Sequence, residues 1–471
     1  MKTAPKEHNE ITRIIMDAAA KARAETDNEP EPAVTKKSKW PVECTVGPGL
    51  EGAIACESKV GYVNGTKGWL IYRGYDIFDL CAHSTFEEVS YLLLHGDLPS
   101  VRQLQRFNQA MIRYRYAPNT LRQMMSLPIE QYNTMAALRL GVLFLRRQTT
   151  YLDRDVELGT PPNLIDSDED SIPMETQPQG EEHAIYEFAQ RLRGRGRKVD
   201  GELGSGADFD ASYRLISASG TLAAGVARLR AGQLPISPNP ELSHAANLLY
   251  MMTGREPTPT EERIMDVALI LHADHGMNAS TFAALVVAST LSDVFFSVGA
   301  GIAALNGPLH GGANAEVLSE LQEIGAPRKV RRWYSKARAQ KRKVMGFGHR
   351  VYKAYDPRAR ILGPLAAYLA DRSDNPAVKN LFDTANALED QVITTLGVEK
   401  KIFPNVDFYS GIVYTALGVP QDMFTPLFAV SRVSGWTARV LEYLKDNRIF
   451  RPRAIYTGPF DKDYVPLEKR D

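Results

Sequence analysis

The chain has 471 residues, and its 56 basic and 56 acidic side chains give a formal net charge of zero. This balance gives no support to a general nucleic-acid-binding or membrane-surface role, and the length is sufficient for two or three domains with buried cores. Three cysteines are too few, and odd in number, for a disulfide framework. Residues 1–25 contain neither a secretory apolar core nor the acid-poor composition of a transit peptide. We therefore expect a cytoplasmic protein.

The chain begins with a charged extension, residues 1–44, which we expect to be loosely ordered. Strand-forming residues follow at 58–74, where Asn64-Gly65 is typical of a tight β-hairpin turn. From residue 84 the apolar spacing becomes helical. Ser84, with Glu87 three positions later, predicts an N-terminal capping box for the first of these helices.

Leu- and Ala-rich helical segments continue to residue 149 and resume at 211, so the sequence predicts a mostly α-helical fold. The intervening stretch, residues 150–210, is rich in carboxylates and proline and then abruptly basic at 191–198. It contains too few apolar residues to offset the entropy of ordering. We interpret it as an exposed, partly disordered insertion. Its basic run could contact RNA or another acidic surface, but a solvated tether is the favoured interpretation.

The long apolar stretch 282–305 could span a bilayer by length alone. Asp293 interrupts it, Ser and Thr are scattered through it, and it leads directly into a polar Gly-Pro-Leu-His-Gly-Gly turn. We therefore predict buried helices of a soluble protein.

Histidine, aspartate and arginine residues recur in turns marked by glycine and proline in the carboxyl-terminal half of the chain. Arginine binds carboxylates through its planar fork, so this combination indicates a site for a carboxylic acid. The segments are HADHGMNAST (272–281), GPLHGGAN (307–314), GFGHRVYKAYDPR (346–358), PNVDFYSG (404–411), AVSR (429–432) and RPRAIYTG (451–458).

His310 lies in a turn before the helical segment 313–322, where the positive end of the helix dipole disfavours an imidazolium. We expect a neutral hydrogen-bond donor there, and the alternative is a structural turn histidine. Asp407 precedes the helical segment 408–417 and is either an N-cap or an ionised base. Arg432 lies in an apolar helix, where a buried guanidinium must have a partner. That partner is either a core carboxylate or a ligand.

His272 and His275 are one helical turn apart, a spacing compatible with metal ligation. The sequence has no HExxH pattern and no obvious third ligand, so we expect no metal. It also has neither a P-loop nor a GxGxxG fingerprint, and a nucleotide site therefore cannot be assigned from a phosphate-binding motif.

Together the six segments resemble the citrate synthase family over about residues 45–471, apart from the insertion. The resemblance implies an all-α fold of two helical domains with a small N-terminal β-hairpin. The large domain would comprise residues 45–310, the small domain 311–415, and residues 416–471 would return to the large domain and end in a C-terminal arm. The family is homodimeric, and a higher oligomer is a further possibility.

The resemblance also implies a role for each matching residue. Asp407 would remove a proton from the methyl group of acetyl-CoA, His310 would stabilise the enol oxygen, and His349 would polarise the ketone of oxaloacetate. The residues that would bind oxaloacetate are His275, His349, Arg358, Arg432 and, across the dimer, Arg451. Backbone at Gly346 and Gly348 and the side chain of Lys353 would contact CoA, although Lys353 is equally consistent with a solvated surface lysine. The family often has an acidic residue after the binding histidine, where this chain has Gly276.

The implied activity is that of an acyltransferase, citrate synthase, which condenses acetyl-CoA with oxaloacetate and water to give citrate and CoA. No metal or redox cofactor is implied. A 2-methylcitrate synthase, which uses propionyl-CoA, shares every motif, because one methylene changes pocket binding by only ~1–3 kcal/mol. A noncatalytic scaffold with the insertion as its binding element is the third possibility.

Overall fold

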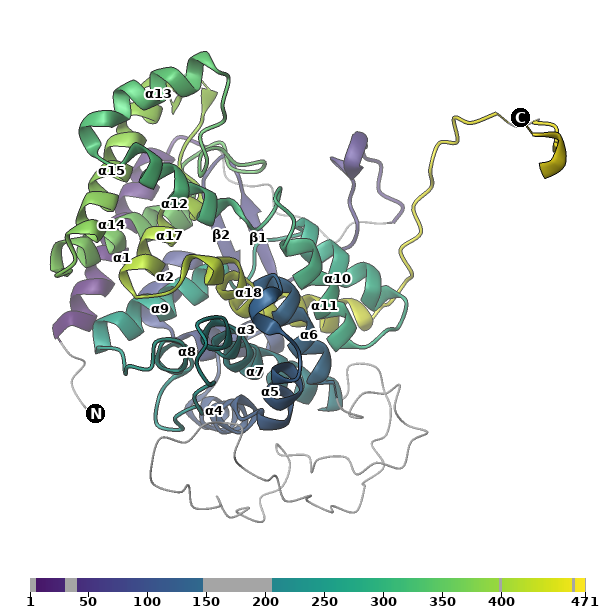
Figure 1. The fold of residues 1–471 in the computed structure, drawn as a ribbon, viewed down its shortest axis with the longest axis horizontal. Helices are drawn as coiled ribbons and strands as arrows, with labels where there is room; N and C mark the ends of the chain where they lie inside the picture. The colour runs from purple at the N-terminus through teal and green to yellow at the C-terminus, as the bar shows by residue number, and fades with distance from the viewer. Residues whose placement is uncertain (1–5, 30–39, 147–205, 398–399, 460–461, 471) are drawn as a thin grey trace, which may run out of the picture.

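A computed structural model describes residues 6–29, 40–146, 206–397, 400–459 and 462–470, and in these ranges the chain is predominantly α-helical (Figure 1). The predicted all-α class is confirmed. The helices that precede the insertion are α1 (Lys6–Glu25), α2 (Ile77–His83), α3 (Phe86–His95), α4 (Val101–Arg115), α5 (Pro118–Met125) and α6 (Thr134–Phe144). Those that follow it are α7 (Gly206–Arg230), α8 (His244–Thr253), α9 (Pro259–His272), α10 (Ala279–Ser289), α11 (Val294–Leu305), α12 (Ala313–Ile324), α13 (Val330–Ala339), α14 (Pro357–Arg372), α15 (Pro376–Val392), α17 (Val406–Ala416) and α18 (Phe424–Leu444).

The expectation of a loosely ordered extension is wrong for residues 6–25, which form helix α1. Ile11, Ile15, Ala18 and Ala19 recur at helical spacing and are buried, so they form one apolar stripe. Helix α1 lies against α2, α9 and α14 (Figure 1). The charged residues that suggested disorder occupy the other faces of an amphipathic helix.

The predicted β-hairpin is present as part of a small antiparallel sheet of β1 (Gly61–Asn64), β2 (Trp69–Tyr72) and β3 (Tyr75–Asp76). Its turn differs from the prediction. Asn64 pairs with Trp69, so the connection is longer than a two-residue turn, and the positive φ falls on Gly68 at 62°. Gly65 is required for another reason, because a Cβ there would lie 2.0 Å from the carbonyl oxygen of Val351. The hairpin therefore lies directly against the segment that follows His349.

The capping box also lies one position later than predicted. Thr85 caps α3 and Glu88 completes the box, whereas Ser84 ends α2. Glu87 is buried, and its Oε1 accepts a hydrogen bond of 2.8 Å from the backbone N–H of His244. A tertiary contact thus uses the side chain that the sequence assigned to the cap.

The apolar stretch 282–305 forms parts of two helices, α10 and α11, as predicted. Asp293 caps the second helix by accepting hydrogen bonds from the backbone of Phe295 and Phe296. Within the ranges that the structure describes, no helix has both the length and the apolar character needed to cross a membrane. Most of the insertion predicted at 150–210 lies outside the described residues, and its last residues, 206–210, are the start of α7.

Helices α12 to α17 pack chiefly against one another, and α18 is buried among α3, α7, α9, α10 and α11. Trp436 and Arg432, both on α18, are among the largest fully buried side chains. The chain after α18 extends away from the helical body (Figure 1). Helix α14 contacts both α9 and α17, and α9 contacts α18, so candidate residues on and beside these helices can come together.

Candidate active site

Asp407 lies in the first turn of α17 and is free of the capping role. Asn405 is the N-cap, and its Oδ1 accepts the backbone N–H of Asp407 at 3.0 Å. Within the described residues, Oδ1 of Asp407 is buried and accepts no hydrogen bond. Burial raises the pKa of Asp407 to about 6, against the opposing effect of the Arg358 guanidinium. A carboxyl with this pKa is still mostly ionised at pH 7, as a base must be.

His349 lies in a turn whose backbone is fixed to the start of α17. Gly348 donates its N–H to Phe403 O at 2.9 Å, and Asn405 donates its side-chain Nδ2–H to Gly348 O at 3.0 Å. The ring Nδ1 of His349 accepts the backbone N–H groups of Val351 and Tyr352. The proton of the neutral ring is therefore on Nε2, and burial lowers the pKa of His349 to about 4.

His275 lies next to His349 although the two are far apart in sequence. Their ring centroids are 5.2 Å apart, and Nε2 of His275 is 3.2 Å from the hydroxyl of Tyr352. Burial, reinforced by Arg358, lowers the pKa of His275 well below its usual value. The following residue, Gly276, has φ of 62° and donates its N–H to Asp274, a left-handed backbone that glycine adopts without strain. Two neutral imidazoles thus share one side of the site.

Arg358 is paired within its own turn. Its Nε and Nη2 donate to the two carboxylate oxygens of Asp356 at 3.0 and 2.8 Å, and both side chains are buried. Asp356 also accepts the N–H of Val406 at 3.2 Å. The carboxylate therefore orients the candidate substrate arginine and ties it to the helix that carries the candidate base.

Arg432 shows the opposite pattern. Its Nε donates to His272 O at 2.5 Å and its guanidinium lies over the ring of Phe428. Its Nη2 is buried without a hydrogen-bond partner, and Arg432 forms no ion pair within the described ranges. The nearby carboxylate of Asp274 is instead paired with Arg439 through two bonds of 2.7 Å. The alternative of a core salt bridge for Arg432 is thus not what the structure shows, and the guanidinium is available for an anion.

His310 is oriented by Ser280, at the start of α10. Its Nε2 accepts the backbone N–H of Ser280 at 3.2 Å and lies 2.8 Å from the Ser280 hydroxyl. Nδ1 therefore carries the proton. Burial, with a smaller effect of Arg432, lowers the pKa of His310 to about 4. The ring is a neutral donor, as expected, but the dominant cause is desolvation.

Electrostatic interactions connect these side chains, three of which lie on α14, α17 and α18 and three in the segments between helices. Arg358 and Arg432 both act on Asp407, and Arg432 acts on His310. Arg358, His349 and Arg432 act on His275. The structure therefore brings together His275, His310, His349, Arg358, Arg432 and Asp407.

The remaining candidates are not part of this cluster. Arg451 is exposed in the chain that follows α18. Lys353 is exposed, and only its backbone is fixed, by the bond from its N–H to Gly65 O at 2.8 Å. Gly346 and Gly348 have φ of 77° and 80°; a Cβ on Gly346 would contact Val317 and Phe408, whereas a Cβ on Gly348 would meet open space.

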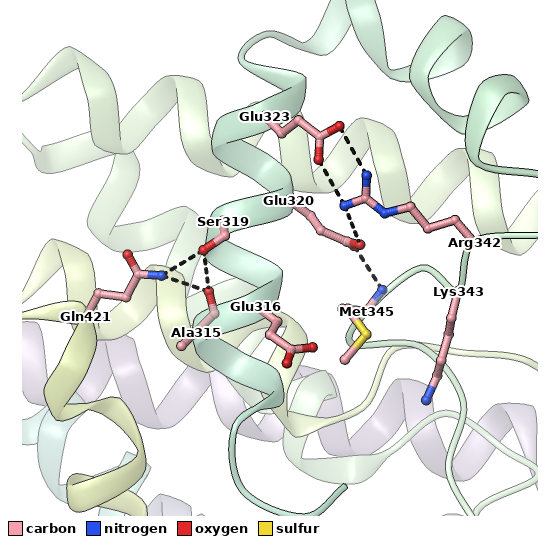
Figure 2. Close-up of a pocket in the computed structure, with 9 residues that line it drawn as sticks. All are labelled: Ala315, Glu316, Ser319, Glu320, Glu323, Arg342, Lys343, Met345 and Gln421. Atoms are coloured by element: carbon pink, nitrogen blue, oxygen red, sulfur yellow. Dashed lines mark hydrogen bonds and ion pairs between the residues drawn. The ribbon is translucent and has the colours of Figure 1, made fainter. Parts of the chain in front are cut away.

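A surface pocket of about 480 Å³ lies beside α12 (Figure 2). None of the candidate residues lines it, and its three glutamates outnumber its two basic residues, Arg342 and Lys343. Glu320 bonds Arg342 at 3.1 Å and accepts the N–H of Met345 at 2.9 Å, as Figure 2 shows. These contacts hold the segment that leads into Gly346, so we interpret the pocket as structural.

Ser280, Asp356 and Asp274 were not predicted as site residues, yet each orients a candidate residue or its neighbour. Two signals were available: Asp356 adjoins Arg358 through a proline, and Ser280 follows the histidine motif. Ser280 bonds His310, and Asp274 bonds Arg439, which are partners far away in the sequence. Local spacing therefore could not predict these two pairings.

The site thus combines a buried carboxylate with neutral imidazoles and two guanidiniums, the groups that proton removal and the binding of a carboxylate would require. The chain matches the family described as citrate synthase, C-terminal domain, over residues 49–453. It is 40% identical to the citrate synthase of Acidithiobacillus ferridurans over 430 residues, covering 91% of this chain and 99% of that relative. It is 39% identical to the citrate synthase of Deinococcus radiodurans over 425 residues, covering 90% and 99%.

Solved structures agree with this relationship. The citrate synthase of Pyrobaculum aerophilum is similar with a TM-score of 0.74 and 38% identity, covering 93% of this chain and 100% of that one. A ternary complex of carboxymethyl coenzyme A and oxaloacetate with citrate synthase from Thermoplasma acidophilum has a TM-score of 0.75 and 32% identity, covering 91% and 100%. The chain belongs to the citrate synthase family and is an enzyme of the acyltransferase class.

A pH dependence follows from the pKa of Asp407. A base must be deprotonated, so kcat/KM is expected to fall as pH decreases through about 6, with a slope of one proton. His310 and His349, with pKa values near 4, remain neutral and do not contribute to this limb. Initial rates between pH 5 and 8 test it, with preincubation controls for stability. A flat profile down to pH 5 would contradict the assignment.

Proposed function

We propose that the enzyme condenses acetyl-CoA with oxaloacetate and water to give citrate and CoA. The observation that carries the proposal is the pair of buried, unpartnered polar atoms, Oδ1 of Asp407 and Nη2 of Arg432. Buried polar groups are normally hydrogen-bonded, so an orphaned carboxylate oxygen and an orphaned guanidinium nitrogen in one site indicate ligand atoms between them. A carboxylate of a dicarboxylic acid would pair with Arg432, and the acidic C–H group of a carbon acid would face Asp407.

In the first step, Asp407 accepts a proton from the methyl group of acetyl-CoA. The electron pair moves to the thioester oxygen, which receives a hydrogen bond from Nδ1–H of His310. Because Ser280 fixes that tautomer before substrate arrives, the donor needs no reorganisation as charge develops. The base and the donor act together on a weak carbon acid.

In the second step, the enol carbon attacks the ketone carbon of oxaloacetate. His349, with its proton on Nε2, donates a hydrogen bond to the developing oxyanion and transfers that proton to it, which forms the hydroxyl of the product. Arg358 and Arg432 bind the carboxylates of oxaloacetate, and His275 lies beside them. The product, citryl-CoA, is then hydrolysed by water at its thioester to citrate and CoA, and all steps use only side chains of the chain and the substrates.

For CoA we propose the turn at Gly346–His349, where the positive φ of Gly348 and the open space beside it let a ligand approach the backbone. Lys353 is exposed nearby in sequence and is available for a phosphate. The expected cytoplasmic location remains a prediction from sequence.

Steady-state kinetics with acetyl-CoA and with propionyl-CoA test the proposal. Higher kcat/KM with acetyl-CoA supports citrate synthesis. A preference for propionyl-CoA would identify a 2-methylcitrate synthase instead, and no turnover with either would favour a noncatalytic scaffold.

We further propose a two-domain homodimer. Residues 45–310 and 416–471 form the large domain and 311–415 the small one, so that closure between them brings Asp407 and His349 to His310 and His275. The grouping of α12 to α17 supports this division. The exposed chain after α18, which extends from the body, is available to reach a second subunit (Figure 1).

A shared site is expected to show complementation. His310→Ala and Arg451→Ala are each expected to be inactive, and mixing them with verified subunit exchange should restore activity. If Arg451 acts in the partner, one site of each mixed dimer has an intact His310 and an intact Arg451. Mixed dimers that stay inactive would mean that Arg451 acts within its own subunit or not at all.

A further inference from the structure

Helix α1 contacts elements from two sides of the candidate active site. It packs against α9, which ends at His272 just before His275, and against α14, which begins next to Arg358 (Figure 1). Ile11 and Ile15 are fully buried in this contact. The helices α9 and α14 also touch each other, but less extensively than each touches α1. Helix α1 therefore contacts both α14, which carries Arg358, and α9, which is followed by His275.

Polar contacts anchor α1 along the length of α14. Glu10 accepts from the hydroxyl of Tyr368 at 3.1 Å and from Arg372 at 3.2 Å. At the other end, Glu25 pairs with Arg360, which is itself stacked over Tyr355 at 4.3 Å. Arg360 and Tyr355 flank the Asp356–Arg358 turn. The contact at Glu25 thus reaches the side chains adjoining a candidate substrate arginine.

A separate contact anchors α1 to α2. The hydroxyl of Thr12 donates to Ala82 O of α2 at 3.1 Å. Exposed ion pairs contribute little individually, so the buried stripe supplies most of the attachment and the polar contacts fix its register. The region that matches the family begins at residue 49, so α1 is outside it.

We propose that α1 is a positioning element that holds α14 against α9 and α2 and thereby sets the separation of Arg358 from His275. Its consequence for kinetics rests on the proposed function, because those residues are assigned to oxaloacetate. A displacement of about 1 Å between such groups is sufficient to change a rate or an affinity by one to two orders of magnitude. Loss of α1 should therefore act on oxaloacetate more than on the acyl-CoA.

The test uses full-length protein with Ile11→Asp and Ile15→Asp, which place charges in the buried stripe and detach α1. The matched control introduces the same residue on the exposed face of the same helix, Arg13→Asp with Ala20→Asp. A milder variant, Glu10→Gln with Glu25→Gln, removes the anchors to α14 and keeps the stripe. If the Ile11/Ile15 variant does not fold, the Glu10/Glu25 variant still tests the proposal.

We expect the stripe variant to raise KM for oxaloacetate by about tenfold, with a smaller change in KM for acetyl-CoA. Amide exchange should become faster in 357–372 as well as in 9–25. A synthetic peptide of residues 6–29, added in trans, should restore the oxaloacetate KM. The control should behave as wild type, and the Glu10/Glu25 variant should show the same shift at smaller size.

Two results would overturn the proposal. One is fast exchange in 9–25 with no change in 357–372 or in the oxaloacetate KM. The other is a lower melting temperature with equal losses for both substrates that the peptide does not reverse, which is the behaviour of a merely stabilising helix. If wild-type protein forms no citrate, the proposed function fails, and the exchange and peptide-binding measurements still decide the role of α1.

Discussion

Asp407→Asn is expected to lower kcat by roughly 10²–10⁴-fold, the usual contribution of a general base, while oxaloacetate still binds. The substitution preserves side-chain volume and leaves Arg358 paired with Asp356. It removes the only group in the cluster that is anionic at pH 7 and has an oxygen without a partner. Steady-state kinetics and calorimetric binding of oxaloacetate provide the measurements.

Stability supplies an internal control for this variant. The folded-state pKa of Asp407 is raised, so ionisation disfavours the folded state, and its contribution to stability decreases as pH rises from about 4 to about 6. Asp407→Asn should therefore unfold at pH 7 no more easily than wild type. Near wild-type turnover would refute the assignment of the base. Loss of turnover with loss of folding would instead indicate a structural role.

Arg432→Met is expected to raise KM for oxaloacetate by roughly 10²–10³-fold, because a buried charged contact to a carboxylate is lost. It is also expected to leave the stability of the free enzyme unchanged or higher. In the free enzyme the Arg432 guanidinium is buried, has one nitrogen without a partner, and has a pKa lowered to about 10 by desolvation. Functional sites commonly contain residues whose burial lowers the stability of the free protein, because binding the ligand requires them there.

Arg439→Met is the matched control on the same helix. Arg439 is equally buried but is paired with Asp274. Its removal leaves an uncompensated buried carboxylate, which costs about 3–5 kcal/mol. Thermal denaturation of both variants distinguishes them: Arg439→Met should melt lower and Arg432→Met should not. The reverse order would mean that Arg432 is the structural arginine.

The sequence was informative wherever the evidence is local. Helical periodicity predicted the all-α class, and Asp293 separated two helices in the longest apolar stretch. Glycine-marked turns located His310 and His349, because such turns let a ligand approach the backbone, and the position before a helical segment located Asp407. The family resemblance then assigned roles to residues whose side chains the fold brings together.

The errors arose where a neighbouring residue or a distant contact took the role that the local pattern assigned. The capping box was placed one residue early because Glu87 is used by a contact to α8, and Asp407 was a candidate N-cap although Asn405 fills that position. The charged composition of α1 concealed a buried stripe whose partners come from distant helices. Periodicity identifies an amphipathic face, but it does not say what covers it.

By itself, the sequence determined the helical class, the family and the identity of the chemical groups, because these depend on residue type and spacing along the chain. Only the tertiary structure decided which arginine is paired and which is unpaired, which nitrogen of His310 and His349 carries the proton, and that burial raises the pKa of Asp407. These properties depend on desolvation and on hydrogen-bond partners far away in the chain, and folding alone brings those partners together.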